Sequence, residues 1–266
     1  MGAAGTDFTP DTVVFITGAS SGIGAAVARQ LGGRGCRVGL MARREAELGA
    51  VAAAVAAAGG QALAVAGDVT RPEDVNAAVA RVTAELGPVD VAFLNAGVGD
   101  FMTVEKFEAA RIRHVFEVNV FGVAHCLEAL LPGMLERGRG TLVATSSLAR
   151  DRGMPTAGGY AASKAALSVL LEGLRPEAAA HGVRVVTFEP GFIKTELTAH
   201  NKFKMPFIME ADAAAARLVD AVAAGQAVVR FPRPLAVASR LLAALPTAVG
   251  DVVATKMSGY RPRRRR

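Results

Sequence analysis

Seven short runs of apolar residues are spread along the chain. They are rich in Val, Leu and Phe, and they lack the polar–apolar alternation of a half-exposed strand. Such continuous runs are typical of strands that are buried on both faces of a parallel sheet. The pattern therefore predicts strands at Thr12–Thr17, Arg37–Met41, Ala62–Ala66, Val89–Leu94, Gly140–Thr145, Val183–Phe188 and Ala227–Phe231.

Longer stretches with helical spacing separate these runs. Thr70 is expected to cap the helix over Arg71–Leu86, with Pro72 in its first turn. Pro176 should bend the helix over Gly159–His181 or end its first half. The expected helices are Glu45–Ala58, Arg71–Leu86, Asn119–Arg137 and Gly159–His181.

Repeated alternation of strand and helix predicts right-handed crossovers and a Rossmann-like α/β fold. We expect one doubly wound parallel sheet of about seven strands, flanked by helices on both faces, in a single domain. The expected organisation is a flexible N-terminus over 1–10, a catalytic domain over 11–232 with a lid near 191–210, a C-terminal amphipathic helical extension over 233–258, and an Arg-rich disordered tail over 259–266. Ligands of such sheets bind beyond the carboxyl ends of the strands, so chemistry is expected there.

Composition and charge narrow the classes of function. The 266 residues are 52% hydrophobic and 20% charged, which permits a large core. Arg261 and Arg263 to Arg266 supply five of the six net positive charges, so the body is nearly neutral. A near-neutral body argues against nucleic-acid binding.

The cysteines and histidines predict no structural metal or disulfide. Cys36 and Cys126 lie in apolar contexts without a CxxC pair, which fits a reducing compartment. The four histidines share no metal-ligand spacing, although His200 could lie near a substrate. Because Met1 to Pro10 lacks the features of a signal peptide, we expect a cytoplasmic protein.

The first expected strand runs into a glycine-rich segment that opens a helix. Glycines let the backbone approach a pyrophosphate, and a helix N-terminus offers free N–H groups. A glycine turn that only packs helix on strand is the alternative, but the position after the first strand favours dinucleotide binding. The residues expected at the cofactor are Gly18, Ser20, Ser21, Gly22, Ile23 and Gly24.

The end of the second strand indicates which dinucleotide is bound. Enzymes that use NAD place a carboxylate there for the ribose 2′-hydroxyl. Ala42 occupies that place in this chain, and Arg43 follows it. An arginine suits a 2′-phosphate, so the sequence favours NADP(H) over NAD, although Arg43 and Arg44 could be a solvated helix start.

Tyr160 and Lys164 are the candidate acid/base pair. Their spacing of four places both side chains on one face of a helix. A phenol has a pKa near ~10, and a nearby ammonium or an oxidised nicotinamide would favour the phenolate. Taken alone, the pair could equally be interfacial.

The glycine spacing and the later motifs together resemble the short-chain dehydrogenase/reductase family over roughly residues 10–200. The segment Thr17–Gly24 matches its TGxxxGIG signature, and Asn95-Ala96-Gly97 matches its NAG motif. The resemblance implies that Asp68 and Val69 contact the adenine. It also places Pro190, Gly191, Ile193 and Thr195 against the nicotinamide.

The same resemblance implies the catalytic set. Ser147 lies thirteen residues before Tyr160, at the family's spacing, and would hydrogen-bond the substrate oxygen. Asn119 matches the residue that holds a water linking Lys164 to solvent, although an Asn at a helix start could be only a cap. The implied reaction is hydride transfer between nicotinamide and a carbonyl/secondary alcohol pair, in which Tyr160 and Lys164 also contact the cofactor.

Three segments leave their roles open. The charges Arg150, Asp151 and Arg152 could face the substrate entrance, but the sequence favours solvated side chains. The apolar residues of Gly191–Met209 could pack on the body or cover an apolar ketone, alcohol or acyl chain. The stretches Leu235–Leu245 and Thr247–Met257 could cover the pocket, form a subunit contact or, less favoured, rest on a membrane.

The resemblance implies a homodimer through the helices of Asn119 and Tyr160, whereas the divergent C-terminal extension puts the family's tetramer in doubt. Two other functions stay open. One is a 3-oxoacyl-carrier reductase, and the other is a catalytically silent NADP-binding sensor or scaffold. The intact Ser147, Tyr160 and Lys164 favour an enzyme of unassigned carbonyl specificity.

Overall fold

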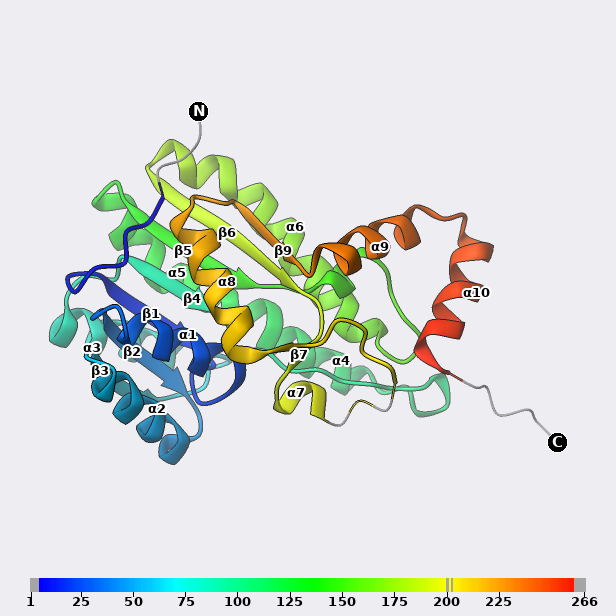
Figure 1. Cartoon of the computed structure of the whole chain (residues 1–266), viewed down its shortest axis with the longest axis horizontal. Coiled ribbons are helices and arrows are strands. Elements are labelled where there is room, and N and C mark those ends of the chain that lie inside the picture. Colours follow the sequence, from blue (N-terminus) through cyan, green and yellow to red (C-terminus); the bar gives the residue numbers. More distant parts are fainter. Residues whose placement is uncertain (1–4, 200, 202, 261–266) are drawn as a thin grey trace.

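A computed structural model describes residues 5–199, 201 and 203–260. Seven parallel strands form one sheet in the order β3-β2-β1-β4-β5-β6-β9 (Figure 1), which confirms the predicted doubly wound architecture. The strands are β1 Val13–Thr17, β2 Arg37–Ala42, β3 Gln61–Ala66, β4 Val91–Leu94, β5 Gly140–Thr145, β6 Val183–Pro190 and β9 Val228–Phe231.

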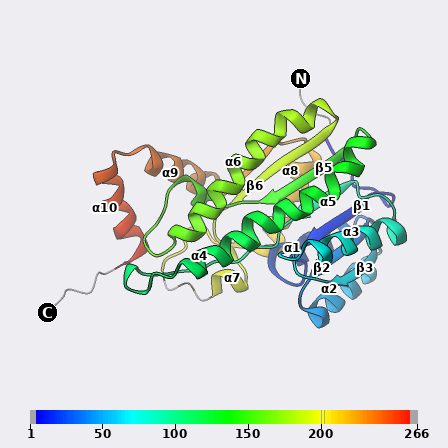
Figure 2. The same cartoon turned by 180° about the vertical axis from the view of Figure 1, so that it is seen from behind.

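Helices cover both faces of the sheet, which explains why the strands are apolar at every position. Along β1, Val14 and Ile16 belong to one core cluster, whereas Val13 and Phe15 belong to the other. Helices α1, α2 and α8 lie on the face seen in Figure 1, and α3, α5 and α6 lie on the face seen in Figure 2. Their bounds are α1 Gly22–Gly32, α2 Glu45–Ala57, α3 Pro72–Leu86, α5 Gly122–Glu136, α6 Gly158–Ala180 and α8 Ala211–Ala223.

The helix that carries Asn119 begins earlier than the sequence predicted. Helix α4 (Ala109–Phe116), a π-helical turn (Glu117–Phe121) and α5 follow one another without a break. Asn119 therefore lies inside the π turn, so the expectation that it heads a helix was wrong. Ala109–Glu136 is long and apolar enough to cross a membrane by length and composition alone, but this helix belongs to the layer that covers the sheet.

One expected detail of the other helices was wrong. Arg71 occupies the N-cap position of α3, and Thr70 instead donates its amide and its hydroxyl to Asp68 Oδ1, each at 3.0 Å. Helix α6 runs through Pro176 to Ala180, one residue short of the predicted end at His181, so Pro176 does not end its first half.

Short elements frame the region after β6. Strands β7 (Ile193–Lys194) and β8 (Met209–Glu210) form a parallel pair, and α7 (Glu196–Ala199) lies between them in sequence. Two single 3₁₀ turns, Val104–Lys106 and Leu148–Asp151, follow β4 and β5. The segment expected as a lid thus contains a short helix between two short paired strands, and it lies beyond the carboxyl end of the main sheet.

The two ends of the chain differ in how they meet the body. Phe8 packs against the core and stacks on Phe93 at 6.5 Å between ring centroids, where the sequence predicted a flexible segment. Helices α9 (Arg233–Ala244) and α10 (Thr247–Ser258) form a bent arm beyond β9 (Figure 1). Residues 1–4 and 261–266, which include most of the predicted Arg-rich tail, lie outside the described residues.

Candidate active site

A cavity of about 670 Å³ lies beyond the carboxyl ends of the strands. Its walls come from the loops that follow β1 to β6 and from the inner faces of α9 and α10. The strand order reverses between β1 and β4, so the cavity occupies the crevice where doubly wound sheets bind ligands. The cavity is therefore where we locate the predicted chemistry.

The glycine loop forms one wall of the cavity. Gly18 has a φ of 63°, and a Cβ on Gly24 would lie 2.4 Å from the Gly18 oxygen, so both positions need glycine. Gly24 lies behind the loop, whereas Gly18, Ser20, Ser21, Gly22 and Ile23 line the cavity. Among the described residues, α1 has no acidic side chain in its first turn and no side-chain cap from Ser21. The start of α1 is thus suited to an anion such as a pyrophosphate.

The other predicted cofactor residues lie on the same wall. Thr17 joins the loops after β1 and β4, because its Oγ1 accepts the amides of Asn95 (3.1 Å) and Ala96 (3.2 Å). A close-packed junction of this kind holds the wall in one shape. The predicted residues that line the cavity here are Asp68, Val69, Asn95, Ala96, Gly97, Pro190, Gly191, Ile193 and Thr195.

Arg43 and Arg44 follow the end of β2, and the sequence predicted a cofactor contact only for Arg43. The Arg43 side chain is 62% exposed and lies 3.7 Å from Asp68 Oδ2. Arg44 donates to Ser21 Oγ at 2.8 Å and to Ser20 Oγ at 3.2 Å, which places it on the glycine loop. No local signal could have singled out Arg44, because these contacts cross more than twenty residues of sequence.

Arg44 also ties the glycine loop to the segment after β6. Its guanidinium lies 3.0 Å from Glu196 of α7, and this hydrogen-bonded pair lowers the pKa of Glu196. Both side chains are substantially exposed, so the contact adds little stability. Together, the uncapped helix start and the two arginines fit an anionic dinucleotide cofactor.

Ser147, Tyr160 and Lys164 all line the cavity. Ser147 follows β5, and its Oγ accepts the Ala149 amide at 3.1 Å. The Ser147 hydroxyl also hydrogen-bonds Tyr160. Lys164 Nζ lies 5.8 Å from the centroid of the Tyr160 ring and donates to the Thr145 carbonyl at 2.8 Å. The helical spacing thus brings the pair together as predicted.

Burial controls the protonation of this pair. Desolvation raises the pKa of Tyr160 above its usual value, and the hydrogen bond from Ser147 opposes that shift only in part. Desolvation also lowers the pKa of Lys164 to about 8. The sequence predicted that nearby positive charge would favour the phenolate. In the chain alone, burial prevails and Tyr160 is a neutral phenol.

Asn119 lies behind the cavity wall and is fully buried. Its Oδ1 accepts the Val98 amide at 2.8 Å, and its Nδ2 donates to the Val98 carbonyl at 2.9 Å and to Ser163 Oγ at 3.0 Å. Ser163 in turn donates to the Tyr160 carbonyl at 2.7 Å. The side chain therefore positions the start of α6 against the loop after β4. A role in holding water stays a prediction.

The charges after Ser147 are not solvated, so that expectation was wrong. Arg150 lies 2.8 Å from Glu189, and Asp151 lies 2.5 Å from Arg230. Arg230 Nε lies 2.7 Å from Glu189 Oε2, although the two are not aligned as a hydrogen bond. The partners belong to β6 and β9, far away in sequence, which is why the pattern near Ser147 did not reveal them.

The rest of the cavity is predominantly apolar. Phe203 lies edge-on to Phe101 and Phe192, with centroids 6.0 and 5.9 Å apart, and all three rings line the cavity. The extension contributes Leu235, Leu242 and Met257 to the same lining. Other apolar residues of the predicted lid differ, because Met209 packs on the core and Phe207 is exposed. His200 lies outside the described residues.

The remaining candidate groups have no part in this site. Within the described ranges, no cluster of three His, Cys, Asp or Glu side chains is placed to hold a metal ion. Burial raises the pKa of the Cys36 thiol to about 11 and that of Cys126 to about 12. Both thiols are therefore poor nucleophiles at neutral pH.

Comparison with known families identifies related sequences. Residues 12–205 match the family model described as short chain dehydrogenase. An uncharacterized oxidoreductase of Myxococcus xanthus is 41% identical over 242 residues, which cover 91% of this chain and 96% of the relative. The ketoacyl reductase HetN of Nostoc sp. is 34% identical over 202 residues, which cover 76% of this chain and 70% of HetN.

Solved structures show the same fold. A short chain dehydrogenase/reductase from Burkholderia phymatum in complex with NAD matches with a TM-score of 0.80 at 26% identity, covering 91% of this chain and 94% of that one. An alcohol dehydrogenase from the archaeon Thermococcus sibiricus, complexed with 5-hydroxy-NADP, matches with a TM-score of 0.75 at 29% identity. That match covers 83% of this chain and 94% of the archaeal one.

Proposed function

The chain belongs to the short-chain dehydrogenase/reductase family, and we propose that it uses NADP(H) to interconvert an apolar carbonyl compound and its secondary alcohol. The observation that carries the proposal is the meeting of Ser147, Tyr160 and Lys164 in one cavity with an uncapped glycine-loop helix. The apolar remainder of that cavity supports an apolar substrate.

The side chains divide the work at the substrate oxygen. Bound NADPH supplies the hydride that adds to the carbonyl carbon. Tyr160 donates its proton to the carbonyl oxygen, which suits its neutral form in the folded chain. Ser147 donates a hydrogen bond to the same oxygen as negative charge develops there. Lys164 lies beside the Tyr160 ring, so its positive charge stabilises the phenolate that remains. In the reverse direction, Tyr160 takes the proton of the alcohol.

Preference for NADP(H) is supported by the residues at the end of β2. Ala42 offers no carboxylate to a ribose hydroxyl, while Arg43 and Arg44 offer two guanidinium groups. Arg44 already binds Ser20 and Ser21. The related structures hold either kind of dinucleotide, so the proposal depends on this chain's own arginines.

Arg43→Ala and Arg44→Ala should each weaken NADPH binding about 10- to 100-fold and leave NADH binding nearly unchanged, because only NADPH carries the 2′-phosphate. Titration of nucleotide fluorescence measures both affinities. Arg81→Ala is the matched control, since Arg81 pairs with Glu85 on the surface of α3. If wild type binds NADH at least as tightly as NADPH, the proposed preference is wrong.

A 3-oxoacyl thioester is a second candidate substrate, because HetN, one of the relatives, is a ketoacyl reductase. NADPH oxidation should therefore be followed with apolar ketones and with acetoacetyl thioesters side by side. Faster turnover of the thioesters would favour the second candidate. Tight NADPH binding without turnover of either class would favour the silent sensor instead.

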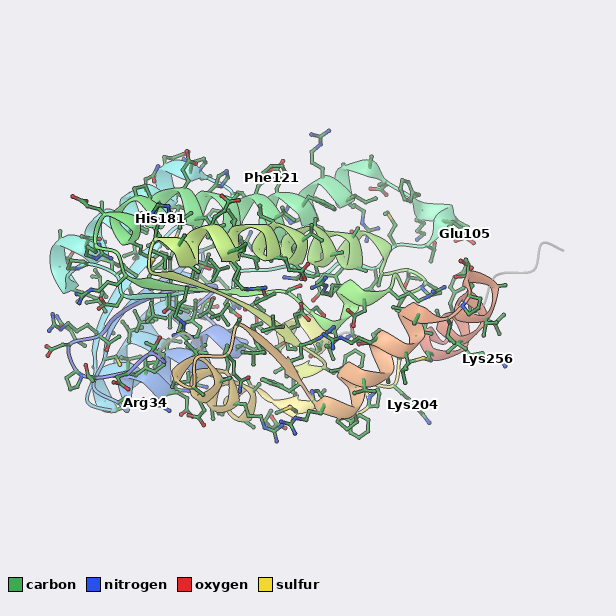
Figure 3. All side chains as sticks on the ribbon, turned by 90° about the horizontal axis from the view of Figure 1, so that it is seen from above. Arg34, Glu105, Phe121, His181, Lys204 and Lys256 are labelled. Atoms are coloured by element: carbon green, nitrogen blue, oxygen red, sulfur yellow. The ribbon has the colours of Figure 1, made fainter. Side chains whose placement is uncertain are left out.

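We also propose a homodimer through the outer faces of α5 and α6. Val169 and Leu170 are exposed on α6, and Phe121 is exposed at the start of α5. Figure 3 shows Phe121 on the outer side of this helical layer. Exposed apolar side chains on adjacent helices are suited to an isologous contact, in which each copy presents the same patch.

A further inference from the structure

The C-terminal arm exposes apolar side chains along its outer face. On α9, Val237 and Leu241 are 58% and 65% exposed, and they are one helical turn apart. The same face continues through Leu245 into α10, where Val249 and Val252 are exposed. Only a few positions of the arm, such as Leu242 and Ala254, are buried. The arm is therefore apolar both where it meets the body and where it meets solvent.

Other exposed apolar residues gather at the same end of the molecule. Figure 3 shows Glu105, Lys204 and Lys256 together at the end opposite Arg34 and His181. Next to Glu105 in the sequence, Val104 is 79% exposed, and Phe107, two residues further on, is 64% exposed. We use the name apolar rim for this end of the molecule together with the outer face of α9 and α10. Its exposed apolar residues are Val104, Phe107, Val237, Leu241, Leu245, Val249 and Val252. Apolar surface gathered at one end of a protein indicates an interaction site.

Charge is distributed as unevenly as the apolar surface. Residues 233–266 contain eight basic residues and only one acidic residue, Asp251, for a net charge of +7. The whole chain carries +6, so residues 1–232 carry −1. Asp251 is itself paired with Arg152, at 2.7 Å. The sequence that forms the arm and follows it is thus strongly cationic, whereas the rest of the protein is nearly neutral.

We propose that the apolar rim docks on an anionic lipid surface. Exposed Val, Leu and Phe side chains enter the boundary between headgroups and acyl chains, and basic residues beside them are attracted to anionic headgroups. A second copy of the chain fits the rim less well, because residues 233–266 of each copy carry a net charge of +7 and two copies would repel each other. Apolar surface combined with net positive charge therefore favours an anionic lipid surface over a second copy of the chain as the partner of the rim.

The position of the cavity fits this orientation. The inner faces of α9 and α10 line the cavity through Leu235, Leu242 and Met257, while their outer faces form the rim. An apolar substrate dissolved in the lipid would therefore lie next to the helices that bound the cavity. Docking itself does not depend on the proposed reaction, so the two can fail separately.

Co-sedimentation with lipid vesicles tests the docking. Full-length protein should sediment with vesicles of equal parts phosphatidylglycerol and phosphatidylcholine at low salt. It should sediment far less with phosphatidylcholine alone or in high salt, because salt screens the attraction. Absence of binding to the anionic vesicles, or equal binding to both kinds, would overturn the proposal.

Variants separate the apolar contribution from the charged one. Leu241→Asp with Val252→Asp, and separately a chain that ends at Ser258, should each weaken vesicle binding about tenfold or more. Leu135→Asp is the matched control, because Leu135 is exposed near the C-terminal end of α5 and does not belong to the rim. NADPH binding should be unchanged in all three proteins, which shows that they fold. If the double variant leaves vesicle binding intact but lowers the oligomeric state, the rim is a contact between copies and the proposal fails.

Discussion

Lys164 shows how function and stability conflict at a single residue. Its side chain is buried, and burial lowers its pKa to about 8 from an ordinary value of 10.5. The folded state therefore disfavours the charged form, which is the form that stabilises a phenolate on Tyr160. At neutral pH, the protonated Lys164 reduces the stability of the fold.

Lys164→Met should raise the free energy of unfolding by about 1–3 kcal/mol at pH 7 while abolishing turnover. The gain is the removed desolvation of the ammonium, less the lost hydrogen bond to the Thr145 carbonyl. Urea denaturation measures the difference.

The pH dependence provides the control for this prediction. Between pH 8 and 10.5 the unfolded chain keeps the Lys164 proton that the folded chain has lost, so wild-type stability rises with pH there. The advantage of the variant should shrink across that window. A variant less stable than wild type at pH 7 would contradict this account of Lys164.

At the residue scale, the sequence predicted which groups meet but not how they are protonated. The spacing of Tyr160 and Lys164 follows from helix geometry, so it could be read directly. Their burial depends on the whole cavity wall, and this is what raises the pKa of Tyr160. Arg44 was passed over for a related reason, since its contacts with the glycine loop arise only in three dimensions.

At the scale of elements, a buried charge network joins the C-terminal arm to strands β6 and β9 and to the turn that follows Ser147. Glu189 of β6 is 1% exposed and lies between Arg150 and Arg230. Asp151 accepts Arg230 of β9 and also the hydroxyl of Ser239 on α9, at 2.6 Å. Glu189 directly precedes Pro190, so the network fixes the cavity wall and the arm together.

Arg230→Met should lower the free energy of unfolding by about 3 kcal/mol, because it leaves Asp151 and one oxygen of Glu189 buried without their cation. Chemical denaturation measures the loss. Arg81→Met is the control, since its pair with Glu85 is exposed and should contribute only about 0.3–0.5 kcal/mol. Equal effects of the two substitutions would show that the network does not stabilise the fold.

Element boundaries show where sequence patterns stop being informative. The apolar runs predicted every strand of the sheet, because burial on both faces constrains each position of a strand. The unbroken passage from α4 through the π turn into α5 was not predicted. There, packing against the sheet maintains helix before Asn119, where the local pattern indicated a helix start.

At the scale of the whole molecule, two exposed apolar surfaces lie in different places. One is on the outer faces of α5 and α6, where Figure 3 shows Phe121, and the other is the apolar rim at the end that carries Lys256. A single contact cannot cover both. We assign the first to a second copy of the chain and the second to lipid.

Phe121→Asp with Val169→Asp should convert the proposed dimer to a monomer, because the double change would bury charges in the contact between helices. Light scattering after gel filtration measures the mass. Leu241→Asp with Val252→Asp on the rim is the matched control and should leave the dimer intact. A wild-type protein that is already monomeric at micromolar concentration would contradict the assignment.

The most direct test of the central claim compares Tyr160→Phe with wild type in a single turnover of an apolar ketone, with NADPH affinity measured on the same samples. The account predicts that Tyr160→Phe binds NADPH as tightly as wild type, because the ring remains. It should transfer hydride at least about 1,000-fold more slowly, because the oxygen loses its proton donor. A variant that retains most of the wild-type rate would show that Tyr160 is not the acid, and the proposed mechanism would be wrong.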